Sequence, residues 1–328
     1  MEENRVLNQK HKFVNIIILI AYLIYLVTSS LVSGIISDNH VEKTKDWVSD
    51  AFDYTWVQTE EGYDLHYQAV ISNHTSGLID LVNLRFLLLD EEGEVIAGFI
   101  HRYEDLQAGE NRLVENTHSF SEKSTIIEQS TYVPFNNQLS NLIQFSFGFL
   151  FLIPLFFINR KSYVDDFITF KNDPKKHIGH IFSGFLLVYL MAFIAQVIMI
   201  SLNVQETSMN ELAIQSMFTS DWISIITLFF SLVIFAPIIE ETVFRKSLYN
   251  IVQPRFGHIG AVIISGLIFG FLHVAGWGDF IQIIPYAFMG LSFSYIYYYS
   301  GRNVYVVIGI HALNNLIPYL TYTSRLFE

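Results

Sequence analysis

Ionisable and amide side chains interrupt three apolar stretches in the second half of this sequence. They are Glu240, Glu241 and Arg245 in the first stretch, His273 in the second, and His311 and Asn315 in the third. A charged side chain at the centre of a bilayer costs about 3 kcal/mol on insertion scales, so such residues are functional candidates by default. A carboxylate, two imidazoles and a carboxamide are sufficient to activate a water molecule and to stabilise an oxyanion.

Helical spacing assigns neighbours within this set. Glu241 and Arg245 are four residues apart, so they share a helix face and can form the ion pair that makes both tolerable in an apolar setting. Glu240 is rotated by about 100° from Glu241 and is left to face another helix. His311 and Asn315 are also four residues apart, and we expect them to point to one place.

The composition places these residues in a membrane protein. Of 328 residues, 52% are hydrophobic and 15% are charged, and the mean hydropathy is +0.37. Soluble domains contain about 25% charged residues. The chain has no cysteine, which excludes disulfides, thiolate metal sites and a cysteine nucleophile. Seven apolar blocks have about the length that a bilayer requires, and they lie at residues 13–36, 139–158, 179–203, 222–244, 259–276, 280–300 and 303–320.

Basic residues alternate between the connections, as the positive-inside rule requires. They gather before the first block and after the second, fourth and sixth, and are Arg5, Lys10, Lys12, Arg160, Lys161, Lys171, Lys175, Lys176, Arg245, Lys246, Arg255 and Arg302. Residues 204–221 have none. We therefore expect a multi-pass protein of the cell membrane with a cytoplasmic N-terminus and residues 37–136 on the extracytoplasmic side. Glu240 and His273 reach one depth only if the fourth helix continues past Arg245.

Residues 37–136 differ from the rest of the chain. They hold 19 acidic and 6 basic residues, a net charge of −13, against −12 for the whole sequence. Leu65, Tyr67, Ala69 and Ile71 alternate with more polar residues, which is typical of a β-strand with one buried face. We predict an inserted β-sandwich domain that recognises an extracytoplasmic partner. Its acidity indicates a well-solvated surface, and nothing in the chain indicates binding to nucleic acid.

The expected fold class is a mainly α-helical multi-pass membrane protein of about seven transmembrane helices with this β-sandwich inserted. Its expected parts are a cytoplasmic tail and first helix (1–36), the extracytoplasmic domain (37–136), the second helix and a cytoplasmic loop (137–178), and the domain that carries the three motifs (179–320).

The three motifs together resemble a known family. Glu-Glu-x-x-x-Arg, Phe-x-x-x-His and His-x-x-x-Asn, in this order on successive apolar helices, are similar to the CPBP family of intramembrane proteases. That family includes CAAX prenyl endopeptidases and bacterial Abi-type proteins. The resemblance implies that Glu240 and His273 activate the attacking water, while His311 and Asn315 stabilise the oxyanion. It implies a supporting role for Glu241 and Arg245.

Alternatives remain open at this point. Glu240, His273, His311 and Asn315 could ligate a zinc ion, although Asn is an unusual zinc ligand and no His-Glu-x-x-His occurs; we prefer glutamate chemistry that requires no cofactor. The function we expect is an intramembrane endopeptidase acting on a peptide or a membrane-associated protein of a bacterium. A catalytically silent membrane scaffold that acts through residues 37–136 is the alternative. A proton-coupled transporter is disfavoured, because the sequence lacks the internal symmetry typical of transporters.

Overall fold

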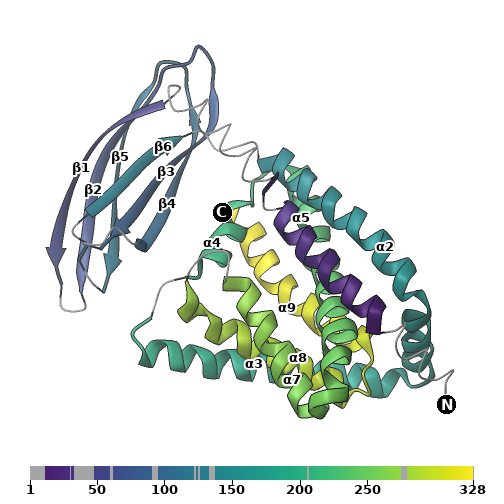
Figure 1. Ribbon diagram of the computed structural model, residues 1–328. Coiled ribbons are helices and arrows are strands. Elements are labelled where there is room, and N and C mark those ends of the chain that lie inside the picture. Colours follow the sequence, from purple (N-terminus) through teal and green to yellow (C-terminus); the bar gives the residue numbers. More distant parts are fainter. Residues whose placement is uncertain are drawn as a thin grey trace. The chain divides into compact units, whose positions relative to one another are not determined.

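The computed structural model describes residues 12–29, 31–32, 48–59, 62–90, 95–121, 123–124, 126–132, 137–204, 207–274 and 279–327. The chain divides into two compact units, a helical unit formed by residues 1–30 and 137–328 and a β-rich unit formed by residues 31–136 (Figure 1). The predicted boundary at residues 36 and 37 lies outside the described residues, and so does most of the predicted N-terminal tail.

The β-rich unit contains six strands in two antiparallel sheets. They are β1 (Val48–Gln58), β2 (Tyr63–Asn73), β3 (Ile79–Leu89), β4 (Val95–Leu106), β5 (Asn111–Phe120) and β6 (Ile126–Tyr132). One sheet has the order β1-β2-β5 and the other β4-β3-β6. The alternating apolar residues of β2 are all buried, as are Val82, Leu84, Phe86 and Leu88 of β3. Tyr67 and Phe86 bring their rings within 4.6 Å, so the two sheets share one core.

The helical unit begins with the helix Lys12–Ser29. It continues with α2 (Asn137–Asn172), α3 (Pro174–Ser201), α4 (Met209–Ser216), α5 (Trp222–Leu228), η1 (Phe229–Phe235), α6 (Ala236–Glu241), η2 (Thr242–Tyr249), α7 (Asn250–Val274), η3 (Phe280–Gln282), α8 (Ile283–Tyr299) and α9 (Val304–Arg325). The N-terminal helix packs on this unit through Tyr22, whose ring meets Phe244 at 5.8 Å.

Six described spans are long and apolar enough to cross a membrane, so the chain is a multi-pass membrane protein, but the sequence predicts seven crossings. The difference lies in Trp222–Val274, one helical run of 53 residues that holds two predicted blocks. A straight helix of this length would measure about 80 Å, against about 30 Å of hydrocarbon. The run is broken at Gly257, whose φ is 68°, and it folds back on itself. Ser265 Oγ donates a hydrogen bond of 2.8 Å to the Phe244 carbonyl, which joins the two arms.

The segment predicted as a cytoplasmic loop after residue 158 is helical instead. The helix α2 extends to Asn172, so Arg160 and Lys161 stand on it. Its 36 residues are about 54 Å long, well beyond the hydrocarbon thickness, so one end of the helix projects past the apolar layer. One residue, Asp173, separates α2 from α3, and its side chain accepts a hydrogen bond from the Lys176 backbone N–H.

The arm that carries the two glutamates is irregular. Two π-helical stretches, η1 and η2, enclose the short α6, so the backbone hydrogen bonds shift from four to five residues on both sides of Glu240 and Glu241. Such stretches are rare and concentrate at functional sites. The helix does continue past Arg245 as expected, and all eight residues of η2 are buried.

Close packing of α7 on α8 depends on glycine (Figure 1). A Cβ atom at Gly270 would lie 2.6 Å from the Ala287 backbone nitrogen, and one at Gly266 would lie 2.7 Å from the Leu291 nitrogen. A Cβ at Gly290 would meet the Gly266 carbonyl oxygen at 2.5 Å. Small residues therefore let the two backbones approach, as is usual between membrane helices. The contact between α7 and α8 at Gly270 positions His273, which follows three residues later on α7.

The glycine contact generates a prediction for stability. Gly270→Ala forces the backbones of α7 and α8 apart, and overpacking of this kind costs about 1–3 kcal/mol. We expect a clear fall in the apparent unfolding temperature of the purified protein in detergent. Gly179→Ala in α3 is the matched control, because nothing lies within 4 Å of its Cβ position. An unchanged unfolding temperature for Gly270→Ala would contradict the packing argument.

Candidate active site

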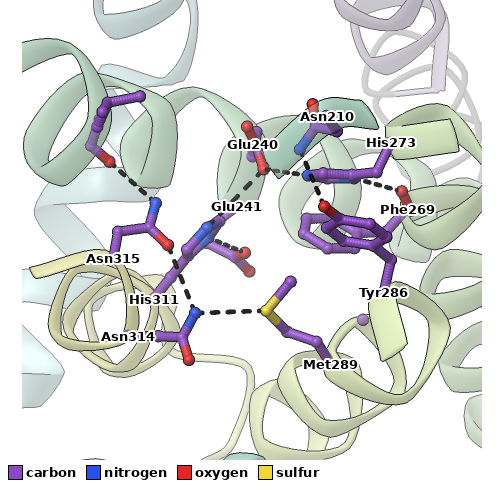
Figure 2. Close-up of polar contacts among 12 residues, drawn as sticks. Asn210, Glu240, Glu241, Phe269, His273, Tyr286, Met289, His311, Asn314 and Asn315 are labelled. Atoms are coloured by element: carbon purple, nitrogen blue, oxygen red, sulfur yellow. Dashed lines mark hydrogen bonds and ion pairs between the residues drawn. The ribbon is translucent and has the colours of Figure 1, made fainter. Parts of the chain in front are cut away.

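Glu240 and Glu241 are adjacent on α6 and face different neighbours. Glu240 points between two histidines of other helices (Figure 2): its Oε2 lies 4.0 Å from His273 Nε2 on α7 and 3.9 Å from His311 Nε2 on α9. Its side chain is 17% exposed, and that of His273 is 21% exposed. Glu241 is fully buried and accepts a hydrogen bond of 2.9 Å from His311 Nδ1. The structure thus brings Glu240, His273 and His311 together.

The partners of the two imidazoles determine which nitrogen faces Glu240. His273 Nδ1 lies 2.8 Å from the Phe269 carbonyl oxygen, and that oxygen can only accept a hydrogen bond. His311 Nδ1 likewise faces a carboxylate. Both Nδ1 atoms therefore carry a proton, and in the neutral rings both Nε2 atoms present a lone pair towards Glu240. Phe269, the first residue of the Phe-x-x-x-His motif, thus orients the histidine at its end.

Arg245 is held within an aromatic enclosure and is fully buried. Its Nε lies 3.0 Å from Glu241 Oε2, so the ion pair predicted from the spacing is present. One Nη atom donates a hydrogen bond of 3.2 Å to the Gly290 carbonyl. The guanidinium carbon lies 4.9 Å from the Phe269 ring centroid and 5.5 Å from that of Phe293. Cation–π contact and ion pairing together offset the cost of removing this charge from water.

Asn315 lies on α9 one turn after His311 (Figure 2), but its amide is engaged elsewhere. Its Nδ2 donates a hydrogen bond of 2.9 Å to the Leu232 carbonyl in η1. That π-helical stretch thus gains a side-chain partner for one of its carbonyls. The second N–H of the same amide remains available to a ligand. The site therefore contains Asn315 at its edge, beside His311 and away from Glu240.

Five further side chains lie at or beside the site, and no pattern in the sequence predicts them. The Tyr286 ring stacks on His273 at 4.8 Å with an interplanar angle of 20°. Its hydroxyl lies 2.8 Å from Ser208 Oγ and accepts a hydrogen bond of 3.1 Å from Asn210 Nδ2. On the other side, Asn314 contacts Met289 through a 3.4 Å N–H···S interaction. These contacts join α4, α7, α8 and α9, which are brought together only by the packing of the helical unit.

The donor atoms as arranged do not fit a tetrahedral zinc ion. Two ligands of one such ion, each bound at about 2.0–2.2 Å, lie about 3.4 Å apart. The corresponding separations here are 3.9 and 4.0 Å. Within the described part of the chain, no three His, Asp or Glu side chains lie at metal-binding spacing.

The arrangement suits a water molecule. A gap of about 4 Å between two polar atoms is too long for a direct hydrogen bond and matches a bridge through one water. Glu240 Oε2 is buried and accepts no hydrogen bond from the described residues, so it can accept a proton from such a water. The carboxylates of Glu240 and Glu241 with the Arg245 guanidinium carry a net charge of −1.

Comparison with known proteins supports the predicted resemblance. Residues 222–317 match the family model described as Type II CAAX prenyl endopeptidase Rce1-like. The match spans Glu240, His273, His311 and Asn315, so the resemblance that these residues carried in the sequence is confirmed for this segment.

Two curated relatives are similar to part of the chain. An uncharacterized protein of Mycoplasma capricolum subsp. capricolum is 34% identical over 101 residues, which are 30% of this chain and 29% of that protein. The Bacillus subtilis protein named "Putative membrane peptidase YdiL" is 32% identical over 82 residues, 25% of this chain and 32% of that protein. The similarity thus spans about a third of either relative. No solved structure matches the chain.

The buried pair of Glu241 and Arg245 should contribute more to the stability of the protein than an ion pair at the surface. Glu241→Gln leaves the Arg245 charge buried without a carboxylate, and breaking a buried pair costs about 3–5 kcal/mol. We expect a large loss of apparent unfolding temperature in detergent.

The control for this variant is Glu110→Gln in the β-rich unit, where Glu110 pairs with Arg112 at 2.9 Å near the surface. Solvent screens that pair, so the control should leave the unfolding temperature nearly unchanged. Equal effects of the two substitutions would show that the buried pair does not hold the helices together.

Proposed function

We propose that this chain is an intramembrane endopeptidase of the CPBP type. One observation carries the proposal: three helices direct Glu240, His273 and His311 at a single point within a membrane protein. The family match over residues 222–317 and the resemblance to a protein named as a membrane peptidase support a peptidase rather than another hydrolase. The substrate in this proposal is a peptide or a membrane-associated protein.

In the proposed reaction, Glu240 acts as the base. A water molecule that donates hydrogen bonds to Glu240 Oε2 and to His273 Nε2 attacks the carbonyl carbon of the scissile peptide bond and gives one proton to Glu240. The C–N bond of the tetrahedral intermediate then breaks, and Glu240 passes this proton to the leaving amine. The water is thus divided between the new carboxyl and amino termini. Positioned bases of this kind contribute about 10²–10⁴-fold in rate.

The developing oxyanion needs hydrogen-bond donors, and α9 offers two of them. Asn315 has one N–H group that Leu232 does not use. His311 can donate from Nε2 only as an imidazolium, because its Nδ1 proton is directed to Glu241. Glu241 therefore has a second proposed role: it stabilises the charge on His311 while its other oxygen pairs with Arg245. Removing one oxyanion donor typically lowers kcat by about 10²–10³-fold.

The proposed mechanism uses no metal, because the donor separations do not suit a tetrahedral zinc ion. We also propose that the β-rich unit is a sandwich domain on the extracytoplasmic side, where it recognises a partner. The N-terminus lies in the cytoplasm in this proposal. Support for the orientation comes from the basic residues, which gather on alternate connections along the sequence.

The proposed chemistry predicts the outcome of a peptide comparison. We expect specific peptides to be released by cells or vesicles that contain the wild-type chain and to be depleted at least about 100-fold with Glu240→Gln or His273→Ala, because both variants lose water activation. Quantitative mass spectrometry of released peptides is the measurement. Asp165→Asn, at an exposed carboxylate of α2, is the matched control and should behave as wild type. If stably inserted Glu240→Gln still releases the same peptides, the chain is not a glutamate-dependent peptidase.

Metal dependence has its own test once a cleaved peptide is known. We expect the purified protein to retain its rate after treatment with a strong chelator, since the water is activated by Glu240 itself. Elemental analysis of the same sample reports whether zinc was bound. Loss of activity that added zinc restores would replace the proposed mechanism with a metal-dependent one.

A further inference from the structure

His311 is held by two contacts that fix the direction of its Nε2 atom. Its Nδ1 lies 2.9 Å from a carboxylate oxygen of Glu241. The Phe293 ring stacks on its face, with 4.8 Å between the ring centroids and an interplanar angle of 26°. Phe293 is completely buried, so packing in the core keeps its ring in place. A hydrogen bond at one nitrogen and a ring over one face together lock the rotamer of the imidazole.

His273 has contacts of the same two kinds. Its Nδ1 donates to the Phe269 carbonyl at 2.8 Å. The Tyr286 ring stacks on its face with 4.8 Å between the centroids and an interplanar angle of 20° (Figure 2). The bond at Nδ1 is the weaker of the two cases, because its acceptor is a neutral carbonyl, and hydrogen bonds to charged groups are about twice as strong. The direction of Nε2 towards Glu240 therefore depends more on the stacked ring here than it does in His311.

The stacked ring at His273 is held by its hydroxyl group. Tyr286 lies in the first turn of α8 and is only partly buried, in contrast to Phe293. Its hydroxyl lies 2.8 Å from Ser208 Oγ, at the N-cap of α4, and accepts a hydrogen bond of 3.1 Å from Asn210 Nδ2. A phenylalanine could make the same stack but neither of these two contacts. The hydroxyl thus does for Tyr286 what core packing does for Phe293.

The helix α4 is a firm anchor for this hydroxyl, because other hydrogen bonds fix its own position. The Met209 backbone N–H donates to Asp279 Oδ2 at 2.8 Å, and Gln215 Nε2 donates to the Tyr322 hydroxyl of α9 at 3.2 Å. The helix lies outside residues 222–317, the segment that matches the family model. The contacts that hold the Tyr286 hydroxyl thus come from a part of the chain that the match does not include.

We propose that Tyr286 is a positioning residue for His273, and that Ser208 and Asn210 of α4 anchor it. The ring keeps the imidazole in the plane that directs its Nε2 towards Glu240 Oε2, 4.0 Å away. Tyr286 itself takes no part in proton transfer. The effect of this positioning on catalysis rests on the proposed function, whereas the orientation of the imidazole does not.

NMR of ¹⁵N-labelled histidine in the full chain tests the orientation of the ring without any hydrolysis. The bond to Phe269 requires the tautomer of His273 with its proton on Nδ1, and the spectrum of His273→Gln identifies its resonances. We expect this tautomer alone in the wild type and a mixture of both tautomers in Tyr286→Phe, because a ring that is free to turn loses the carbonyl. Tyr298→Phe, on the same helix, is the matched control and should keep the wild-type tautomer. An unchanged tautomer in Tyr286→Phe would overturn the proposal.

The cleavage rate tests the effect on catalysis once a cleaved peptide is known. We expect Tyr286→Phe to lower kcat about 10- to 100-fold and to leave KM within about twofold, because a displacement of about 1 Å at a reacting group can cost 100-fold. Asn210→Ala should act in the same direction. The double variant should be no slower than Tyr286→Phe alone, since both substitutions remove one shared contact. Effects that multiply in the double variant would overturn the role of α4 as the anchor.

The two measurements let the positioning role and the proposed function fail separately. A tautomer mixture in Tyr286→Phe without any released peptide that depends on Glu240 would refute the peptidase and leave the positioning role intact. A lower kcat of Tyr286→Phe with an unchanged His273 tautomer would refute the positioning role and leave the peptidase. The unfolding temperature of each variant is measured alongside, so that a loss of folded protein is not counted as a loss of kcat.

Discussion

The buried contact of Glu241 with Arg245 and His311 is the interaction on which the candidate site depends. A carboxylate and a guanidinium, both fully removed from solvent, are 3.0 Å apart, and the same carboxylate holds the imidazole at 2.9 Å. Unpaired, either charge would destabilise the helical unit by several kcal/mol. The contact joins α6 to α9 and η2 to α8 through Gly290, whereas the adjacent Glu240 Oε2 accepts no hydrogen bond from the part of the chain that the structure describes. Stability and reactivity are thus divided between two neighbouring glutamates.

The backbone around these two glutamates is irregular. Adjacent residues of a helix point about 100° apart, so α6 presents Glu241 to Arg245 and Glu240 to the two histidines. The π-helical stretches on both sides of α6 adjust the rotation of the flanking residues without breaking the helix. Glycine contacts between α7 and α8 position α7, whose His273 lies 4.0 Å from Glu240.

Much of this arrangement could be predicted from the sequence, because membrane physics makes its polar residues conspicuous. The Glu241–Arg245 pair follows from helical spacing, and the meeting of Glu240, His273 and His311 from the order of the motifs. The bond from Glu241 to His311 could not be predicted, since either glutamate could face α9. Likewise, the contact of Asn315 with Leu232 depends on a π-helical carbonyl, and that of Tyr286 with α4 joins residues 76 apart or more. Spacing along one helix determines a shared face, but the partner of that face depends on the packing of the whole bundle.

The charge of the cluster also constrains its chemistry. With both glutamates ionised and Arg245 protonated, the dry centre of the helical unit carries one excess negative charge, and a single proton removes it. Glu240 and the two Nε2 atoms are the groups of the cluster that can hold this proton. In the proposed mechanism His311 holds it, and the proton that Glu240 takes from water then offsets the negative charge that forms on the substrate oxygen. Because Glu241 is paired with Arg245 and His311, Glu240 is the carboxylate that can take up the proton from water.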